Sequence, residues 1–331
     1  MQTGYVRAGL VGWIAIAASG CSKPAADVAG PSTADAATSS GLGDGGGAGC
    51  TTPTVAAGVS LGSAYQASYT AYLLGELPGL PDEKYGGLTL KSGDPNTLLL
   101  GCYDNSTDVG ALCAVALARS CGHVVGFEGS VAQVASAPDV DGSIDYAANG
   151  VLLFTGWPSN TMGELAPGGT APARTLDLTS LGVTSSVGTL AIVPAGFAGA
   201  GAVKVISYDT GHYYSAALAA DAMGLYTLTG VAQGATLQGG PEGQAYVPLG
   251  SPQFAANSMI LDEWDNNTVV TYSVDGSGDP IVASRAVFLE GITGPEGAFF
   301  DPSTGDFFFS TWNESGGVDR LYVVQGFATI E

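Results

Sequence analysis

The segment Gly240-Pro241-Glu242-Gly243-Gln244-Ala245-Tyr246-Val247 is nearly repeated 54 residues later as Gly294-Pro295-Glu296-Gly297-Ala298-Phe299-Phe300-Asp301. Each copy runs on into a stretch rich in aromatic and β-branched residues. A repeat period of this length is typical of β-propellers, in which each repeat forms one four-stranded sheet, or blade. The sequence therefore predicts an all-β fold built from repeated blades.

Five such units can be followed along the chain. Their opening strands start near Gly87, Gly142, Gly188, Pro241 and Pro295, at irregular separations of roughly 50 residues. Short apolar runs between Gly, Pro, Asn and Asp clusters mark the further strands. We expect these at residues 96–102, 111–119, 123–131, 151–157, 174–178, 202–208, 213–219, 224–230, 258–263, 268–274, 281–289, 306–312 and 320–326.

The fifth unit ends one strand short, because the chain stops at Glu331. The apolar, Tyr-rich segment 64–77 precedes the first unit and can supply the missing strand, so that both ends of the chain would share one blade. Closure of this kind removes exposed sheet edges. The sequence favours a single propeller of five blades. Six blades is the alternative, because the long first unit and segment 64–77 could hide another; an open β-sandwich accommodates the repeat less well.

The first twenty residues have the pattern of an export signal. Arg7 supplies a positive charge, and residues 8–18 form an apolar run too short to span a bilayer as a helix. Ala18-Ser19-Gly20-Cys21 resembles a bacterial lipobox, which implies lipidation of Cys21; an ordinary secretory signal is the alternative. Because Ser22 and Lys23 follow rather than the Asp of an inner-membrane signal, we expect a lipid-anchored cell-envelope protein, with the outer membrane favoured.

Residues 21–49 consist mainly of Ala, Gly, Ser, Thr, Pro and Asp and contain no aromatic residue. Such a segment cannot bury enough apolar surface to offset the entropy lost on ordering. We therefore expect a disordered tether over 21–49 and one β-propeller domain over 50–331.

Four cysteines remain when Cys21 is set aside, an even number that predicts two disulfides in an exported domain. Three pairings are possible. We favour Cys102 with Cys113, at the facing ends of two strands joined by residues 103–112, which leaves Cys50 for Cys121. A zinc site is the less favoured reading, because there is no C-x-x-C pair and the two histidines lie in different units.

The net charge of −21 reflects few basic residues, nine Lys and Arg, rather than many acidic ones. Binding to nucleic acid phosphates needs clustered Lys and Arg, so a nucleic-acid partner is not expected. An acidic surface of this kind could attract Ca²⁺, the one cofactor that the composition suggests, although many secreted β proteins carry such a surface for solubility.

The chain resembles bacterial secreted propellers of the NHL-repeat, strictosidine-synthase-like and gluconolactonase-like groups. The resemblance rests on Gly-Pro-Glu-Gly, on residues 301–311 and on residues 93–100, and it covers roughly residues 60–331. It implies an architecture rather than an activity. The enzymatic members would imply a metal ion in the central channel, bound by Glu, Asn and Asp side chains, and no full set of those ligands can be matched by motif.

Glu242 and Glu296 are the first candidates for a metal site. Each stands between Pro and Gly at the start of an innermost strand, so quasi-symmetry predicts that both lie near one mouth of the channel. Two neighbouring carboxylates repel each other unless a cation binds or one keeps its proton. The alternative is that each accepts hydrogen bonds from backbone N–H groups of a neighbouring blade. Asp262 and Asp265, in the oxygen-rich loop 262–267, form a second candidate calcium site.

Trp157, Trp264 and Trp312 fall near strand ends in three different units, where they could line a ligand-binding rim or pack between blades. His212 could join that rim or act as a base, although a half-buried strand histidine is the simpler reading. No catalytic residues can be assigned, because no nucleophile elbow is present.

Three functions therefore remain open. The sequence favours a lipid-anchored extracytoplasmic propeller that acts as a binding or scaffold protein of unknown ligand. It favours a protein without catalytic activity over an enzyme. The first alternative is a metal-dependent hydrolase of lactone or ester type that uses a carboxylate-lined channel. The second is a calcium-binding structural protein of the cell envelope.

Overall fold

The computed structural model describes residues 49–80, 84–102, 110–254, 257–313 and 317–330. The described residues belong to one compact unit, Gly49–Glu331. The expected export signal, the lipidation site Cys21 and nearly all of the tether lie outside them.

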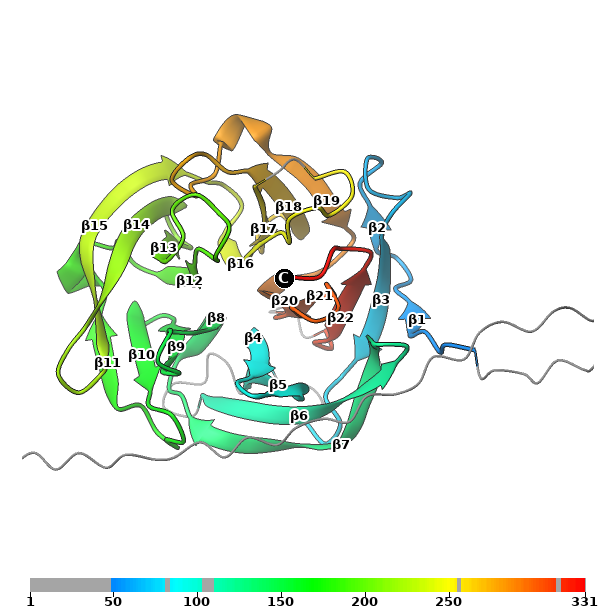
Figure 1. The fold of residues 1–331 in the computed structure, drawn as a ribbon, viewed down its shortest axis with the longest axis horizontal. Coiled ribbons are helices and arrows are strands. Elements are labelled where there is room, and N and C mark those ends of the chain that lie inside the picture. The colour runs from blue at the N-terminus through cyan, green and yellow to red at the C-terminus, as the bar shows by residue number, and fades with distance from the viewer. Residues whose placement is uncertain (1–48, 81–83, 103–109, 255–256, 314–316, 331) are drawn as a thin grey trace, which may run out of the picture. The chain divides into compact units, whose positions relative to one another are not determined.

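Five antiparallel sheets are arranged in a ring, as Figure 1 shows, and we refer to the axis of this ring as the central channel. From the channel outward, the first blade contains β4 (Tyr85–Lys91), β5 (Asp94–Cys102), β6 (Ala111–Ser120) and β7 (His123–Ser136). The second contains β8 (Val140–Tyr146), β9 (Leu152–Gly156), β10 (Thr161–Leu165) and β11 (Arg174–Asp177). The third contains β12 (Val187–Ile192), β13 (Ala202–Ser207), β14 (His212–Ala220) and β15 (Tyr226–Thr236). The fourth contains β16 (Pro241–Tyr246), β17 (Ser258–Glu263), β18 (Thr268–Ser273), β19 (Ala286–Glu290) and β2 (Ser60–Leu61). The fifth contains β20 (Pro295–Phe300), β21 (Phe307–Thr311), β22 (Leu321–Gln325), β3 (Thr70–Gly75) and β1 (Thr54–Val55).

The five-bladed propeller is confirmed, and the alternative of six blades is wrong. The strand expected from segment 64–77 is β3, which pairs with β22 through Tyr72 and Val323 and so completes the fifth blade. Two short strands were not expected: β1 extends the fifth blade beyond β3, and β2 pairs with β19 at the edge of the fourth. Both ends of the chain therefore hold the ring closed.

Several strands differ from expectation: the outermost strands β7 and β15 extend to Ser136 and Thr236, beyond the expected 123–131 and 224–230, and the second and fourth blades differ further. The second blade has a strand, β10, that the sequence did not reveal, because Thr-Met-Gly-Glu-Leu carries little β-branched or aromatic character. The expected strand 281–289 is only half strand: Val282–Ser284 forms a 3₁₀ turn, and β19 begins at Ala286. A second 3₁₀ turn, Thr179–Leu181, lies between the second and third blades.

Glycine is required in the Pro-Glu-Gly motif because the innermost strands of neighbouring blades approach each other closely at this position. A Cβ atom on Gly243 would stand 2.4 Å from the backbone nitrogen of Ala298, and one on Gly297 would stand 2.6 Å from the Gly86 carbonyl oxygen. Real Cβ atoms essentially never come so near to backbone. Glycine at this position therefore lets neighbouring blades pack around a narrow channel.

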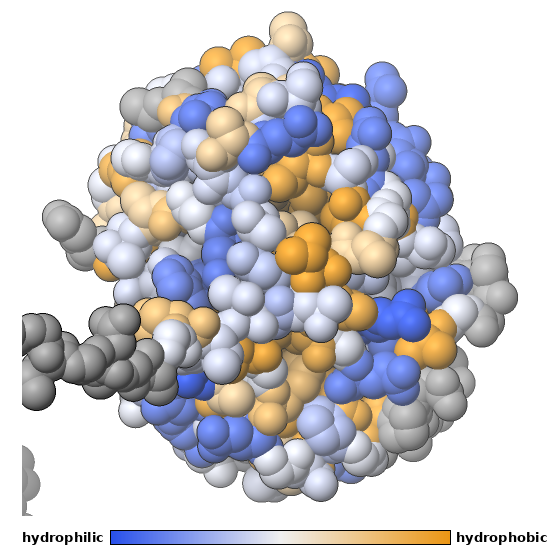
Figure 2. All heavy atoms as spheres, turned by 90° about the vertical axis from the view of Figure 1, so that its right-hand side faces the viewer, coloured by the Kyte–Doolittle hydropathy of each residue, from blue (hydrophilic) through white to orange (hydrophobic). Residues whose placement is uncertain are grey.

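Apolar clusters between the sheets form the core. One of them joins the first and fifth blades and includes Leu98, Val115, Phe308 and Val323. Three of the ion pairs between and within blades join Arg174 with Glu164, Lys204 with Asp279 and Arg285 with Glu263. Paired burial avoids the penalty of an isolated buried charge. On the side that carries β1–β3, hydrophobic and polar residues are interspersed at the surface (Figure 2).

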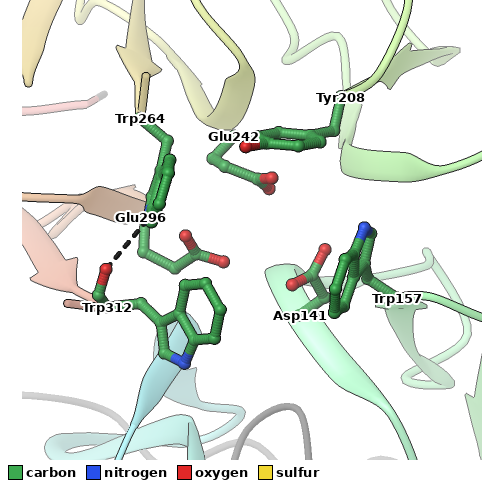
Figure 3. Close-up of a pocket in the computed structure, with 7 residues that line it drawn as sticks. All are labelled: Asp141, Trp157, Tyr208, Glu242, Trp264, Glu296 and Trp312. Atoms are coloured by element: carbon green, nitrogen blue, oxygen red, sulfur yellow. Dashed lines mark hydrogen bonds between the residues drawn. The ribbon is translucent and has the colours of Figure 1, made fainter. Parts of the chain in front are cut away.

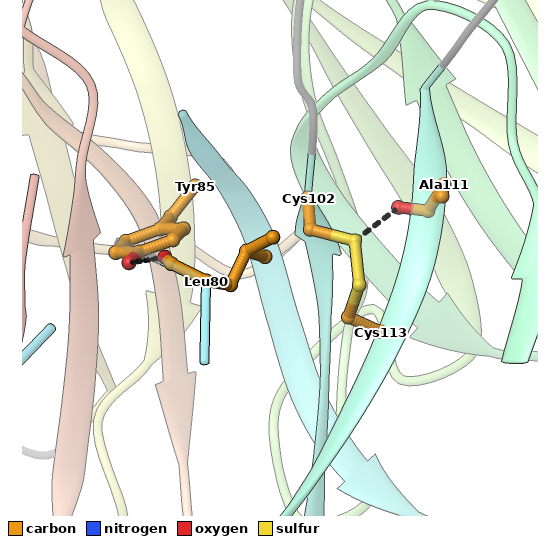
Figure 4. The surroundings of a disulfide bond; sticks show 5 residues. All are labelled: Leu80, Tyr85, Cys102, Ala111 and Cys113. Atoms are coloured by element: carbon orange, nitrogen blue, oxygen red, sulfur yellow. Dashed lines mark hydrogen bonds between the residues drawn. A yellow bond between two sulfur atoms is a disulfide. The ribbon is translucent and has the colours of Figure 1, made fainter. Parts of the chain in front are cut away.

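Two disulfides are present, with the pairing that the sequence favoured. Cys102 at the end of β5 bonds to Cys113 on β6, beside the buried ring of Tyr85, whose hydroxyl donates to the Leu80 carbonyl (Figure 4). Cys50 bonds to Cys121 in the turn between β6 and β7. Disulfides are typical of proteins that fold outside the cytoplasm. In the described part of the chain, no helix has the length and apolar character needed to cross a bilayer.

Candidate functional site

Three carboxylates meet at one mouth of the central channel. Asp141, Glu242 and Glu296 come from β8, β16 and β20, and each offers an oxygen within 4.8 Å of those of the other two. Figure 3 shows the three side chains pointing toward one another. All three are buried, with exposed fractions of 2, 4 and 2%. The two Pro-Glu-Gly glutamates therefore lie together, and a third acid that the sequence analysis did not select joins them.

The register of the innermost strands explains this convergence. Pro241 pairs with Glu263 and Pro295 with Thr311, after which each innermost strand contains a bulge. The residue after the proline, Glu242 or Glu296, turns into the channel at that bulge. In the first and third blades the equivalent positions hold Gly86 and Gly188, so acids enter from only three of the five blades.

Asp141 lies at the corresponding end of β8, where the bulge is one residue longer. A signal for it was present, because Val140-Asp141-Gly142 places an acid before a glycine just as Pro-Glu-Gly does. The sequence analysis placed the start of the second unit at Gly142, so Asp141, one residue earlier, was not selected as a candidate. The packing there is tight: a Cβ atom on Gly142 would stand 2.4 Å from Glu242 Oε2.

Burial dominates the electrostatics of the cluster. Desolvation raises the pKa of Asp141 well above its usual range, while hydrogen bonds from the Gly142 backbone N–H and with Glu296 act in the opposite direction. Asp141 Oδ2 has no hydrogen-bond partner among the described residues. The cluster therefore either keeps a proton or binds a cation, and a cation would satisfy the remaining oxygen.

Four aromatic side chains surround the carboxylates: Trp157, Tyr208, Trp264 and Trp312 line the same cavity. Ring centroids are 6.2 Å apart for Tyr208 and Trp264, 5.6 Å for Trp264 and Trp312, and 6.4 Å for Trp312 and Trp157. Hydrogen bonds orient two of them: Trp264 Nε1 donates to the Trp312 carbonyl at 2.8 Å, and the Tyr208 hydroxyl donates to Asp265 Oδ1 at 3.1 Å. We call these four residues the aromatic ring.

The aromatic ring follows from one position in the repeat. Each member directly follows the second strand of its blade, after Gly156, Ser207, Glu263 and Thr311. The three tryptophans were candidates for a rim, but Tyr208 was not recognised, although it stands at the same position. In the first blade that position holds Tyr103, which lies outside the described residues.

The other candidate residues do not join the carboxylate cluster. Asp262 is fully buried in β17, whereas Asp265 is exposed in the turn that follows and orients Tyr208. His212 begins β14, with Nδ1 3.4 Å from Thr184 Oγ1, and does not line the cavity. Loop 262–267 thus contributes Trp264 to the mouth of the channel and, through Asp265, the hydrogen bond that orients Tyr208.

The cavity between the carboxylates and the aromatic ring is small. Its volume is ≈ 30 Å³, and a water molecule needs roughly 10–15 Å³ in the same measure. Ca²⁺–oxygen distances of about 2.3–2.6 Å place two oxygens that bind the same ion at most about 5 Å apart. The oxygens of the three carboxylates lie within 4.8 Å of one another, so all three can contact one ion. The donor set therefore fits a hard divalent cation such as the resemblance implies.

Comparison with known proteins supports no assignment to a family: no family model and no curated protein matches the chain. Among solved structures it is similar to a putative 6-phosphogluconolactonase from Bacteroides uniformis (14% identity, 73% of this chain and 71% of that one, TM-score 0.37). It is also similar to a luciferin-regenerating enzyme (10%, 85% and 95%, TM-score 0.42) and to virginiamycin B lyase from Staphylococcus aureus (12%, 77% and 99%, TM-score 0.37). These likenesses agree with the resemblance noted from the motifs, and at such identities and scores they carry no argument about activity.

Proposed function

We propose that the protein is an extracytoplasmic binding propeller whose ligand is a divalent cation, Ca²⁺ in the first place, held by Asp141, Glu242 and Glu296. The observation that carries the proposal is the convergence of three buried carboxylates from three blades on one point of the channel. Buried like charges are costly unless a proton or a cation compensates them. Oxygen ligands without sulfur or imidazole favour Ca²⁺ or Mg²⁺ over zinc and copper.

Ca²⁺ fits better than Mg²⁺ for a geometric reason. Mg²⁺ requires near-ideal octahedral coordination and keeps several waters, whereas Ca²⁺ accepts six to eight oxygens in flexible arrangements. Three carboxylates in a cavity of ≈ 30 Å³ leave little room for a hydrated ion. The bound ion would also join three blades at the axis, which is the structural role considered from the sequence.

A hydrolase acting on lactones or esters remains the second candidate. It is favoured by the aromatic ring, which offers apolar faces beside the cation. It needs space for a substrate next to the ion, and the volume of the cavity provides room for an ion and water only. Binding is therefore the proposed function, and turnover of an ester or lactone by the purified protein would overturn that preference.

Thermal unfolding with and without calcium tests the proposal. A ligand that binds only the folded state stabilises it by RT ln(1 + [L]/Kd), about 2.7 kcal/mol at one hundred times Kd. We expect Ca²⁺ to raise the Tm and EDTA to reverse the rise, and Glu296→Gln to abolish the response. Glu290→Gln is the matched control, because Glu290 is an exposed acid outside the cluster. A Tm indifferent to Ca²⁺ and Mg²⁺ would reject the metal site.

A further inference from the structure

The channel has a second mouth, at the end where the innermost strands finish, which we call the far mouth. Three adjoining cavities lie there, of ≈ 520, 160 and 410 Å³, and Ile330 lines all three. The middle cavity is walled by the second to fifth innermost strands, with Ile144, Leu190 and Phe299 among its apolar residues. These cavities share no residue with the carboxylate cluster.

The C-terminal segment crosses this mouth. Phe327 is buried against Tyr69 and Phe300, and beyond it the Ala328 N–H donates to Ser251 Oγ and the Ile330 N–H to the Pro302 carbonyl. Figure 1 shows this end of the chain over the middle of the ring. Ile330 itself remains 44% exposed. The segment thus forms a partial cover over an apolar hollow.

Two residues that line the middle cavity, Gln244 and Asp145, carry acceptor atoms with unused hydrogen-bonding capacity. Gln244 is 5% exposed, and its Nε2 donates to the Lys204 carbonyl, but its Oε1 has no hydrogen-bond partner among the described residues. The carboxylate of Asp145 accepts from the Tyr146 and Ile192 N–H groups at 2.7 and 3.0 Å. A carboxylate has about four acceptor sites, so Asp145 retains capacity. A buried acceptor left without a donor is unfavourable, because it has lost its hydrogen bond to water.

We propose that the far mouth is a second binding site, one that takes a small amphiphilic amine. The alkyl part would lie against the apolar walls beside Phe299 and Ile330, and the ammonium group would donate to Gln244 Oε1 and the Asp145 carboxylate. Because both polar groups are hydrogen-bond acceptors, the ligand must supply a hydrogen-bond donor. The negative charge of Asp145 favours a positively charged donor over the neutral hydroxyl of an alcohol. Burial raises the pKa of Asp145 to about 6, which leaves the group ionised at pH 7.5. This site is independent of the proposed metal site.

Isothermal titration of the whole protein with n-hexylamine, n-hexanol and hexanoate at pH 7.5 tests the proposal. We expect the amine to bind about tenfold or more tightly than the alcohol, and hexanoate not to bind, because a charge-assisted hydrogen bond is stronger than a neutral one. Gln244→Leu should lower amine affinity about tenfold. Asp145→Asn should remove the preference of the site for the amine over the alcohol.

Two further variants keep the outcome interpretable. Ile330→Trp alters an exposed side chain, so it should leave folding intact while it crowds the mouth and weakens amine binding. Glu242→Gln changes the other end of the channel and should leave amine binding unchanged. Equal affinity for amine and alcohol would overturn the proposal. So would binding that survives Gln244→Leu and Ile330→Trp but is lost in Glu242→Gln, since the amine would then sit among the carboxylates and the aromatic ring.

Discussion

Asp262 in the fourth blade holds the position that Ser310 holds in the fifth, but of the two side chains only that of Ser310 has hydrogen-bond partners among the described residues. Ser310 Oγ donates to the Gly86 carbonyl at 2.7 Å and accepts from the Gly297 N–H at 2.9 Å, so it links two innermost strands. Thr155 makes the same kind of link from the second blade, to the Gly188 carbonyl at 3.1 Å. Both oxygens of Asp262 are buried without a hydrogen-bond partner among the described residues.

Replacing Asp262 by Ser should therefore stabilise the protein at neutral pH. Burial raises the pKa of Asp262 well above its usual range, so the folded state keeps a proton that the unfolded state loses above about pH 4. Between about pH 4 and the pKa of Asp262 in the folded state, each rise of one pH unit therefore lowers the free energy of unfolding of the wild type by about 1.4 kcal/mol. We expect Asp262→Ser to show a gain in the free energy of unfolding that grows from pH 4 to pH 7, measured by urea denaturation. Ser310→Asp is the reciprocal variant and should lose stability over the same range; a pH-independent effect of Asp262→Ser would contradict the reasoning.

Terbium luminescence should report occupation of the carboxylate cluster. Tb³⁺ prefers oxygen ligands as Ca²⁺ does, and its emission is sensitised by nearby indole rings. Every tryptophan among the described residues belongs to the aromatic ring. We expect emission excited at the indole band that saturates with Tb³⁺, falls on addition of Ca²⁺ and disappears in Glu242→Gln. Trp264→Phe should lower the emission but not the affinity. Emission unchanged by all three Trp→Phe variants would place the ion elsewhere.

The two disulfides should contribute unequally to stability. Cys50–Cys121 closes a loop with a sequence separation of 71 and Cys102–Cys113 one of 11. Loop-closure entropy predicts a loss of about 4 kcal/mol for the double Ser variant of the first pair and about 3 kcal/mol for that of the second. Chemical denaturation of the two variants measures the difference. A larger loss for the short loop would indicate that packing beside Tyr85, rather than chain entropy, determines the contribution.

Removal of β3 should unfold the domain, whereas removal of β1 should not. β3 pairs along most of β22 and contributes Ala71 and Tyr72 to the core, while β1 adds only a two-residue pairing at the outer edge. We compare both truncated chains with the full chain carrying Cys50→Ser and Cys121→Ser, because each truncation also removes Cys50 and its disulfide. Against that reference, we expect a chain starting at residue 57 to unfold cooperatively with a slightly lowered Tm, and a chain starting at residue 77 to lack a cooperative transition by circular dichroism. Cooperative melting of the shorter chain would show that four blades and a fragment are sufficient.

Lipidation at Cys21 stays a prediction from the sequence. We expect the wild type to incorporate labelled palmitate and to sediment with membranes. Cys21→Ser should incorporate no label and appear in the soluble extracytoplasmic fraction, because a lipid chain supplies the membrane affinity. A wild-type protein without label would favour an ordinary secretory signal.

Much of the fold could be predicted because its signals are local. Pro-Glu-Gly marks a bulge that only glycine can complete, and short apolar runs mark strands such as 258–263, which matches β17. β10 was missed because the neighbours that bury Met162 and Glu164 come from other parts of the second and third blades. β2 and β1 were missed because two-residue strands carry no periodic pattern.

The candidate site could be predicted only in part. Glu242 and Glu296 share a motif, so the sequence brought them together by symmetry. Asp141 also precedes a glycine, but Val140 stands where the two glutamates have proline, and the bulge that follows is one residue longer, so the repeated motif does not align it with them. Tyr208 stands where tryptophans stand in three other blades, a pattern that appears only when the units are aligned at the end of the second strand.

The pairing of β3 with β22 also bears on how the chain reaches its final location. β3 is synthesised long before its partner β22, so the ring cannot close until β22 has been made. If export begins before β22 is synthesised, the export machinery would therefore act on a chain whose ring has not closed. Closure, and with it the assembly of the carboxylates at the axis, would be the final event after delivery.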